Sequence, residues 1–383
     1  MVSNDPRDLL HGNDIRPFTV GVEEEFVLVD PATGLPSLTN TAVVADATNV
    51  ALQLELSQCQ VETCTPVCSN IPELGRELRQ ARLSVARAAA RSGSRPLAVG
   101  VPIFGPPPGS MTDTPRYQLM AERFGPLAEQ VICGCHVHVC IPDRDLAVQV
   151  SNHLRPWLPT LLALTANSPI TDGADTGYAS RRHVLWARWP SAGPPPHLRS
   201  AADYDAAVAK LVEDGHILDT AMVYWDVRLS SHQPTVEIRI SDVPATVEET
   251  ALLACLVRAL VITSVAAVNS GRLPAPIDPA HLRAACRCAA RDGLSGPQFH
   301  TAAGQSRPPP WSIAHLLSYI RPTLEHSGDY EFTRSALARV LGKGNGAVRQ
   351  REAMRIGGPF GVLEMLSRLT TEGCTASEDR QPA

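Results

Sequence analysis

The 383-residue sequence lacks the features that mark several common classes of protein. It has no excess of positive charge, and its formal net charge of −5 gives no general attraction for nucleic acid or an anionic membrane. We expect no apolar run to span a bilayer, and the start, MVSNDPRDLLHGNDIRPF, lacks the basic region and apolar core of a signal peptide. We therefore predict a cytoplasmic protein whose partners include neither nucleic acid nor membrane.

Cysteine is plentiful, but its spacing excludes the common cysteine motifs. None of the ten cysteines forms a CxxC pair, so the sequence has no standard zinc-ribbon or thioredoxin signature. The glycine-rich stretch GKGNG at 342–346 also lacks the spacing of a Walker phosphate loop and reads as a turn. With 44% hydrophobic and 19% charged residues, the composition is that of a globular protein with mostly reduced cysteines.

Hydrophobic periodicity predicts a mixture of strands and helices without a regular alternation of the two. This order favours an α+β fold with a mixed or antiparallel sheet. We expect residues 15–373 to form one domain between flexible segments at 1–14 and 374–383. The predicted strands are 18–29, 52–63, 97–101, 133–142 and 234–243; the predicted helices are 72–91, 115–124, 145–167, 203–214 and 246–269; a long loop is predicted at 168–196.

The stretch CGCHVHVC at 133–140 looks like a soft-metal site but does not have the geometry of one. Successive side chains on a strand point to opposite faces, so Cys133 and Cys135 share one face while His136 and His138 share the other. A tetrahedral zinc site needs converging ligands, and this arrangement separates them. The cysteines fit an apolar buried face, because a free cysteine behaves as a small hydrophobic residue.

Other predicted strands place carboxylates in the same alternating way. Glu23 and Glu25 share a face, and so do Glu237 and Arg239; Glu24 falls on the apolar side, which is tolerable near a sheet edge. Each strand alone is explained by an ordinary exposed face. Together they predict one polar face of an antiparallel sheet, where clustered carboxylates repel one another unless cations lie among them. Oxygen ligands with one imidazole suit Mg²⁺ or Mn²⁺ better than zinc.

Two further glutamates are candidates for the same face. Glu55 lies opposite the leucines of its predicted strand, and Glu62 lies at the end of that strand, where a bulge can set its face.

The segments that carry these residues resemble the carboxylate–amine ligases of the glutamate–cysteine ligase type 2 family. The resemblance implies a glutamine-synthetase-like fold, with a curved, mostly antiparallel sheet whose polar concave face holds the active site and whose other face is covered by helices. It covers most of the chain and is carried by TVGVEEEFVLVDPATG (19–34), QVETCTPVC (60–68), CGCHVHVCIPD (133–143), WDVRLSSHQPTVEIRISDV (225–243) and GNGAVRQR (344–351).

The resemblance also implies roles for individual residues. Arg239 is implied to stabilise the transferring phosphoryl group of ATP, and His138 to contact the substrate. Divalent ions, Mg²⁺ or alternatively Mn²⁺, are implied to lie against the ATP phosphates. The partners are then ATP and small amino acid substrates, with a homodimer as an open alternative to a monomer. The implied metal ligands are Glu23, Glu25, Glu62, His136, Glu237 and Glu55.

The loop at 168–196 and its surroundings are implied to contact substrate. Arg181 and Arg188 lie within DTGYASRRHVLWARWPSAGPPP (175–196), a further segment that matches the family. With Tyr178 and Asn167 they are predicted to bind substrate, because an arginine can hold a carboxylate through two parallel hydrogen bonds. For Arg182, a substrate contact and a solvated basic loop are equally open.

Three positions depart from the family pattern. Cys140 stands where glycine is expected, and Arg287 and Cys288 replace an aromatic and a basic residue. If their helix lines the substrate pocket, these changes alter the choice of amine.

The implied activity is an ATP-dependent ligation of a carboxylate to an amine through an acyl phosphate. In its simplest form, glutamate and cysteine give γ-glutamylcysteine, ADP and phosphate. Two alternatives remain: the same chemistry on a different amine or acid, and a non-catalytic nucleotide-binding relative.

Overall fold

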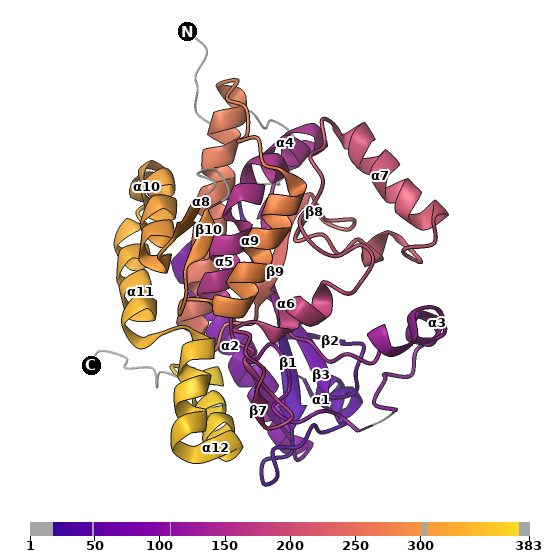
Figure 1. Cartoon of the computed structure of the whole chain (residues 1–383). Helices are drawn as coiled ribbons and strands as arrows, with labels where there is room; N and C mark the ends of the chain where they lie inside the picture. The colour runs from indigo at the N-terminus through magenta and orange to yellow at the C-terminus, as the bar shows by residue number, and fades with distance from the viewer. Residues whose placement is uncertain (1–17, 48–49, 108, 301–304, 375–383) are drawn as a thin grey trace, which may run out of the picture.

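The computed structural model describes residues 18–47, 50–107, 109–300 and 305–374 (Figure 1). The predicted flexible segment 1–14 lies outside these residues, and so does the predicted tail after Cys374. Cys374 itself is buried, with 3% of its surface exposed. One continuous apolar core runs from Phe18 to Cys374, whereas the division into one domain and two flexible ends stays a prediction.

The core of the fold is a seven-stranded sheet in which every strand pair is antiparallel. Its order is β2-β3-β1-β5-β9-β8, with β4 paired to β1. The α+β, antiparallel fold class predicted from the sequence is therefore confirmed. The strands are β1 (Val20–Val29), β2 (Ala51–Leu54), β3 (Gln60–Cys64), β4 (Arg95–Leu97), β5 (Gly134–Cys140), β8 (Val227–Leu229) and β9 (Thr235–Asp242); two small hairpins are β6 (Ile170–Thr171) with β7 (Ala174–Asp175) and β10 (Gln298–His300) with β11 (Gln305–Arg307).

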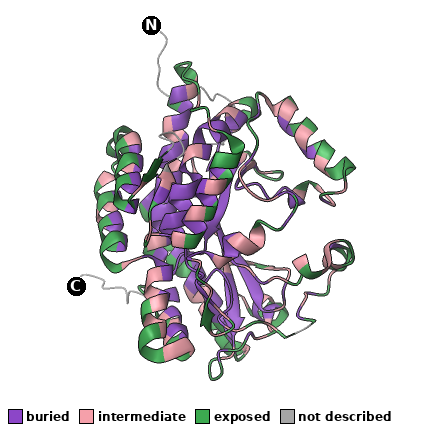
Figure 2. Ribbon diagram, viewed as in Figure 1, coloured by how far each residue is buried: buried purple, intermediate pink, exposed green. Residues whose placement is uncertain are grey.

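Helices α2, α4, α5 and α8 pack against this sheet, and α10 and α11 pack against α8 as an outer layer. The sheet and the inner helices are buried, while the outer helices are exposed on one side (Figure 2). The helices are α1 (Asn40–Asp46), α2 (Ile71–Arg91), α3 (Pro115–Phe124), α4 (Arg144–Leu154), α5 (Leu158–Thr165), α6 (Arg181–Trp186), α7 (Ala201–Glu213), α8 (Val247–Asn269), α9 (Pro279–Asp292), α10 (Pro309–Ser327), α11 (Tyr330–Lys343) and α12 (Gly346–Thr370).

Four predicted elements are wrong in extent. The predicted strand 97–101 is shifted toward the N-terminus, since β4 ends at Leu97. The predicted strand 52–63 is a hairpin of β2 and β3, because the chain turns between Glu55 and Cys59. The predicted helix 145–167 is divided by a 3-10 turn at Arg155–Trp157, where Pro156 lacks the amide hydrogen that a continuous helix needs. The predicted loop 168–196 contains β6, β7 and α6.

Helix α8 corrects the expectation that no apolar run is long enough to span a bilayer. In the described part of the chain it is the one helix long and apolar enough, by length and composition, to cross a membrane. However, 72% of its most apolar window is buried inside the protein, which is the environment of a core helix.

The sequence suggested that Glu24 lies near a sheet edge. In the structure it lies in the middle of the sheet. Strand β1 has β3 on one side and β5 on the other, and Glu24 is fully buried. Its carboxylate accepts hydrogen bonds from Arg82 of α2 (Nη2 to Oε1, 2.6 Å; Nε to Oε2, 3.0 Å) and from the Thr250 hydroxyl of α8 (2.6 Å). The Arg82 guanidinium also donates to the carbonyls of Pro244 and Thr370. A buried charge is tolerated here because every side of it is paired.

Replacing Arg82 with methionine should therefore destabilise the fold by about 3–5 kcal/mol, since it leaves Glu24 charged and unpaired in the core. Urea denaturation measures the loss. Arg87→Met is the matched control, because Arg87 lies on the same helix but is exposed, and it should change stability by about 0.5 kcal/mol or less. Equal losses in the two variants would contradict this role for Arg82.

Candidate active site

The register of four neighbouring strands brings the predicted acidic and imidazole side chains together on one face. Residues directly opposite one another on antiparallel strands have Cβ atoms about 5 Å apart, so opposed pairs are in reach of a shared ligand. The opposed pairs are Glu25 with Glu62, Glu23 with His136, and His138 with Glu237. Glu62 faces its partner without the bulge predicted for it.

The sheet does contain a bulge, but it lies at His136. The pairing of β5 with β9 shifts between Cys135 and Val137, so that Arg239 and Ile240 both fall opposite His136. Extra residues at a bulge bend the strand and redirect its side chains. Here the shift brings Arg239 Nη1 within 3.3 Å of His136 Nδ1, although both groups carry or accept positive charge.

His136 is at the centre of the cluster, with 4% of its side chain exposed. Its Nδ1 lies 3.0 Å from Glu23 Oε2 and 3.9 Å from both Glu62 Oε1 and Glu237 Oε1. Its Nε2 lies 3.7 Å from Glu25 Oε1 and has no hydrogen-bond partner among the described residues. Burial and the nearby Arg239 lower the pKa of His136, so the imidazole is neutral and available as a ligand.

The donor set fits divalent cations. Three groups of side chains each bring their ligand atoms within 4.8 Å of one another, and every predicted metal ligand belongs to at least one group. Carboxylate oxygens dominate all three, which suits Mg²⁺ or Mn²⁺ better than zinc. The groups are Glu23, Glu62 and His136; Glu23, His138 and Glu237; and Glu25, Glu55 and Glu62.

Two carboxyl groups of this cluster have raised pKa values, because they are buried and lie close to other carboxylates. Burial, together with the charge of Glu25, raises the pKa of Glu55 to about 8. Burial and the charge of Glu55 likewise raise the pKa of Glu62 well above its usual range. Carboxylates this close cannot all ionise without a counter-charge. Cations among them would supply it.

Two arginines lie against this cluster. Arg239 pairs closely with Glu237, and Arg228 donates to the same carboxylate from Nε at 2.7 Å. Although burial opposes ionisation, these two guanidinium groups hold the pKa of Glu237 well below its usual range. Burial acts against the charge of Arg239, yet Glu237 and Glu23 raise its pKa, so it is a permanent cation.

A cavity of about 330 Å³ is lined by both acidic and basic side chains. Glu23, Glu25 and Glu62 face it from β1 and β3, and aromatic side chains close it from α3, α6 and the segment before β8. A larger cavity of about 580 Å³ lies elsewhere, but it lacks the carboxylate clusters. The basic and aromatic residues of the smaller cavity are Arg116, Arg182, Arg228, Arg239, Tyr117, Trp186, Trp189 and Tyr224.

The comparison with known proteins agrees with this arrangement. The sequence profile of glutamate–cysteine ligase family 2 matches residues 19–368. The chain belongs to this family.

Two curated relatives and one solved structure are similar to the chain. It is 53% identical over 363 residues, 93% of this chain and 94% of the relative, to a protein of Nocardia farcinica provisionally named glutamate–cysteine ligase 2-1. It is 52% identical over 340 residues, 88% and 93% of the two chains, to one of Mycolicibacterium vanbaalenii provisionally named glutamate–cysteine ligase 2-2. The fold is similar to that of glutamate–cysteine ligase from Francisella tularensis in complex with AMP, with a TM-score of 0.65 and 13% identity over 94% of this chain and 90% of that one. Membership of glutamate–cysteine ligase family 2 makes the protein an enzyme that is a ligase.

Of the basic residues in the 168–196 segment, Arg182 lines the cavity, whereas Arg181 and Arg188 are not among the lining residues. Arg182 is 2% exposed and donates to the carbonyls of Arg239 (3.3 Å) and Ile240 (3.4 Å). Its Nε has no partner among the described residues. The glycine at position 134 is the sequence feature that matches the buried position of Arg182. A Cβ at Gly134 would lie 2.2 Å from Arg182 Nη2 and would displace the guanidinium.

Other predicted substrate residues lie away from the cavity lining. Asn167 is 1% exposed, and its amide donates to the carbonyls of Ala98 and Val243, both at 2.9 Å. Tyr178 is partly exposed and Arg188 is exposed, and neither is among the lining residues. These positions give no support to a direct substrate contact in this family member.

The departures from the family pattern also lie away from the cavity. Arg287 and Cys288 are on α9, which packs on α5 and α6, and no α9 residue lines the cavity. Cys140 is 4% exposed at the end of β5 and is likewise not a lining residue. The lining of this cavity therefore gives no support to an effect of Arg287 and Cys288 on the choice of amine.

His138 sits at the edge of the site. Its Nε2 lies 3.2 Å from Glu23 Oε1, and its Nδ1 lies 3.0 Å from the Thr235 hydroxyl. It is not among the cavity-lining residues, but with Glu23 and Glu237 it forms one of the possible cation sites. A ligand role thus has more geometric support than the predicted substrate contact.

Proposed function

We propose that this ligase uses ATP to activate a carboxylate and joins it to an amine, most simply converting glutamate and cysteine to γ-glutamylcysteine with release of ADP and phosphate. The observation that carries the proposal is the lining of one cavity, which combines clustered carboxylates with four arginines. The carboxylates suit the cations that accompany ATP, and the arginines suit an acidic substrate and the transferring phosphoryl group.

In the first step, an oxygen of the substrate carboxylate attacks the γ-phosphorus of ATP. The bond to the bridging oxygen breaks, ADP leaves, and an acyl phosphate forms. Arg239 acts here as a fixed cation that offsets the negative charge spread over the transferring oxygens. Arg228 keeps Glu237 in place through its two hydrogen bonds of 2.7 and 3.2 Å.

The cation ligands in this proposal are the predicted six together with His138. Mg²⁺, or alternatively Mn²⁺, would supply neutralisation of the phosphate charge when bound. The chain's own part is to hold the ligand atoms in place, which the strand register does before any ion arrives.

In the second step, the amine attacks the acyl carbon and phosphate leaves, giving the amide. The amine must lose a proton, which the departing phosphate or a cavity carboxylate accepts. No covalent enzyme nucleophile is needed. All ten cysteines are free thiols, most of them buried, and this fits a cytoplasmic enzyme that does not use them in catalysis.

The proposal is tested by measuring ADP and phosphate release from purified protein. Release should require Mg²⁺, glutamate and an amine together, and mass spectrometry should find the amide. A screen of amine acceptors decides between cysteine and another amine. Normal nucleotide binding without turnover for any acid and amine pair would sink the proposal in favour of a non-catalytic relative.

Within this proposal, Arg182→Lys should raise KM for the acid substrate by about 10- to 100-fold, because a lysine cannot replace the guanidinium fork. KM for ATP should change much less. The same substitution at Arg181 tests the prediction made from the sequence, and we expect its effect to be smaller. A larger effect at Arg181, or an equal change in both KM values, would contradict the assignment.

A further inference from the structure

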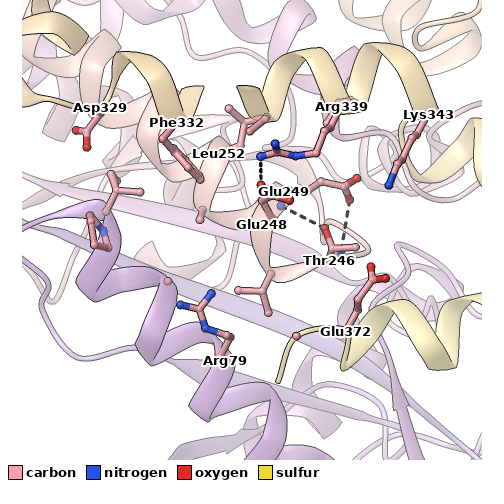
Figure 3. A pocket seen from close by; sticks show the side chains of 18 of the residues that line it. Arg79, Thr246, Glu248, Glu249, Leu252, Asp329, Phe332, Arg339, Lys343 and Glu372 are labelled. Carbon is pink, nitrogen blue, oxygen red and sulfur yellow. Dashed lines mark hydrogen bonds and ion pairs between the residues drawn. The ribbon is translucent and has the colours of Figure 1, made fainter. Parts of the chain in front are cut away.

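A second cavity, of about 580 Å³, lies among helices on the side of the sheet opposite the candidate active site. Its walls come from α2, the first turns of α8, α11, the start of α12 at Arg349, and Glu372 and Gly373, which follow α12 (Figure 3). This volume is within the range of 300–1,000 Å³ that is typical of small-molecule sites.

The cavity has an apolar base. Val247 and Leu252 of α8 and Phe332, Ala336 and Val340 of α11 provide it, and Phe332 is partly exposed there. Apolar side chains that remain in contact with solvent are available to a ligand's hydrophobic part.

The acidic side chains around this base are already paired. Glu248 pairs closely with Arg339, and Glu249 with Arg349 at 2.6 Å. Two more pairs complete the rim: Asp329 with Arg258 at 3.6 Å and Glu372 with Arg368 at 3.4 Å.

Two cations, by contrast, are left without partners. Arg79 of α2 and Lys343 at the end of α11 have no hydrogen bond or ion pair with any described residue. They reach the cavity from different walls (Figure 3). The lining holds four acidic and four basic side chains, but each acid has a basic partner, whereas Arg79 and Lys343 are exposed and pair with no described residue.

We propose that this cavity binds a small amphipathic organic anion, whose apolar part lies on Leu252 and Phe332 and whose acidic group lies between Arg79 and Lys343, and that the bound anion regulates the active site. Charge complementarity selects the anion, because the acids of the lining are neutralised and these two cations are not. The volume selects a small molecule.

The route from this cavity to the active site is short. Arg82 lies one helical turn from Arg79, and Thr250 lies between two cavity-lining residues of α8. Both hydrogen-bond Glu24, the residue between the predicted cation ligands Glu23 and Glu25. A ligand that shifts α2 or α8 thus acts on the strand that carries those ligands. This regulatory part rests on the proposed function, whereas the binding part does not.

The test uses 8-anilinonaphthalene-1-sulfonate, a fluorescent aromatic sulfonate of the proposed chemical class. It should bind the full-length protein saturably with one site in this cavity. The double variant Arg79→Gln, Lys343→Gln should bind it at least about tenfold more weakly, since each charge-assisted contact contributes that order of affinity. The matched control is Arg76→Gln, Arg87→Gln, which removes two exposed arginines of α2 outside the cavity and should bind within about twofold of wild type.

Equal binding by the two double variants, or no saturable binding to wild type, would overturn the site. A changed sedimentation coefficient in the Arg79, Lys343 variant alone would identify this face as a contact between copies of the chain and would also overturn it. For regulation, the probe should change the KM for ATP at least about twofold in wild type and not in that variant; an unchanged KM would overturn the regulatory part. If the protein has no ATP turnover at all, the proposed function fails, and the fluorescence result still decides the binding site.

Discussion

Arg239→Gln should lower kcat for ADP formation by about 10³- to 10⁵-fold, the range associated with arginines that stabilise a phosphoryl transition state. Arg239 is suited to this role because Glu237 and Glu23 raise its pKa and its position opposite His136 is fixed by the bulge in β5 and β9. Its loss leaves Glu237 still paired with Arg228, so the fold should survive. KM for ATP should change far less than kcat, because the charge it meets develops only during transfer.

The control for this prediction is Arg144→Gln, which removes an exposed arginine that pairs with Asp205 at the surface. It should leave kcat unchanged. Circular dichroism and the unfolding midpoint check that Arg239→Gln remains folded. A folded variant with kcat within tenfold of wild type would remove Arg239 from the phosphoryl-transfer step.

Glu62→Gln should have opposite effects on the metal-free and the metal-loaded protein. Without cations, burial and Glu55 raise the pKa of Glu62, so folding favours its protonated form. When the pH is above the pKa that Glu62 has in the unfolded chain, the preference of the folded state for protonated Glu62 lowers the free energy of unfolding. When the pH is below that pKa, this loss is absent. At pH 7 the metal-free variant should consequently melt higher than wild type, by about 2 °C.

With Mg²⁺ the order should reverse. Glu62 contributes to two of the three possible cation groups, so its loss should raise the Mg²⁺ concentration needed for half-maximal activity by about 100-fold or more. Mg²⁺ should raise the melting temperature of wild type more than that of the variant. Glu122→Gln, on the exposed face of α3, is the control. A metal-free Glu62→Gln protein that melts lower than wild type, together with equal responses to Mg²⁺, would contradict a cation site at Glu62.

Much of the site could be predicted from the sequence because the two-residue period of a strand is local. The alternation in VGVEEEFV and GCHVHVC alone indicates that Glu23 and Glu25, and likewise His136 and His138, share a face. Strand order is not local, and this explains the error at Glu24. The residues near Glu24 in the sequence do not indicate that Arg82, 58 residues away, supplies its buried counter-charge.

The arginines proposed to bind substrate were harder to predict, because their burial also depends on parts of the chain that are distant in sequence. Arg181, Arg182 and Arg188 lie on one short segment, and their burial depends on how α6 packs against β9. The division of the predicted strand 52–63 was also hidden, because its turn lacks the glycine or proline that usually marks one.

The three consecutive glutamates of β1 have a consequence for how this chain can change in length. Glu23 and Glu25 point into the site while Glu24 anchors the opposite face. Inserting or deleting a single amino acid in this run would still leave glutamates in place, yet it would turn every later side chain of the strand over and send Phe26 toward the candidate cation ligands. Sequence alignments that place a gap in this run would therefore align chemically different positions under the same letter.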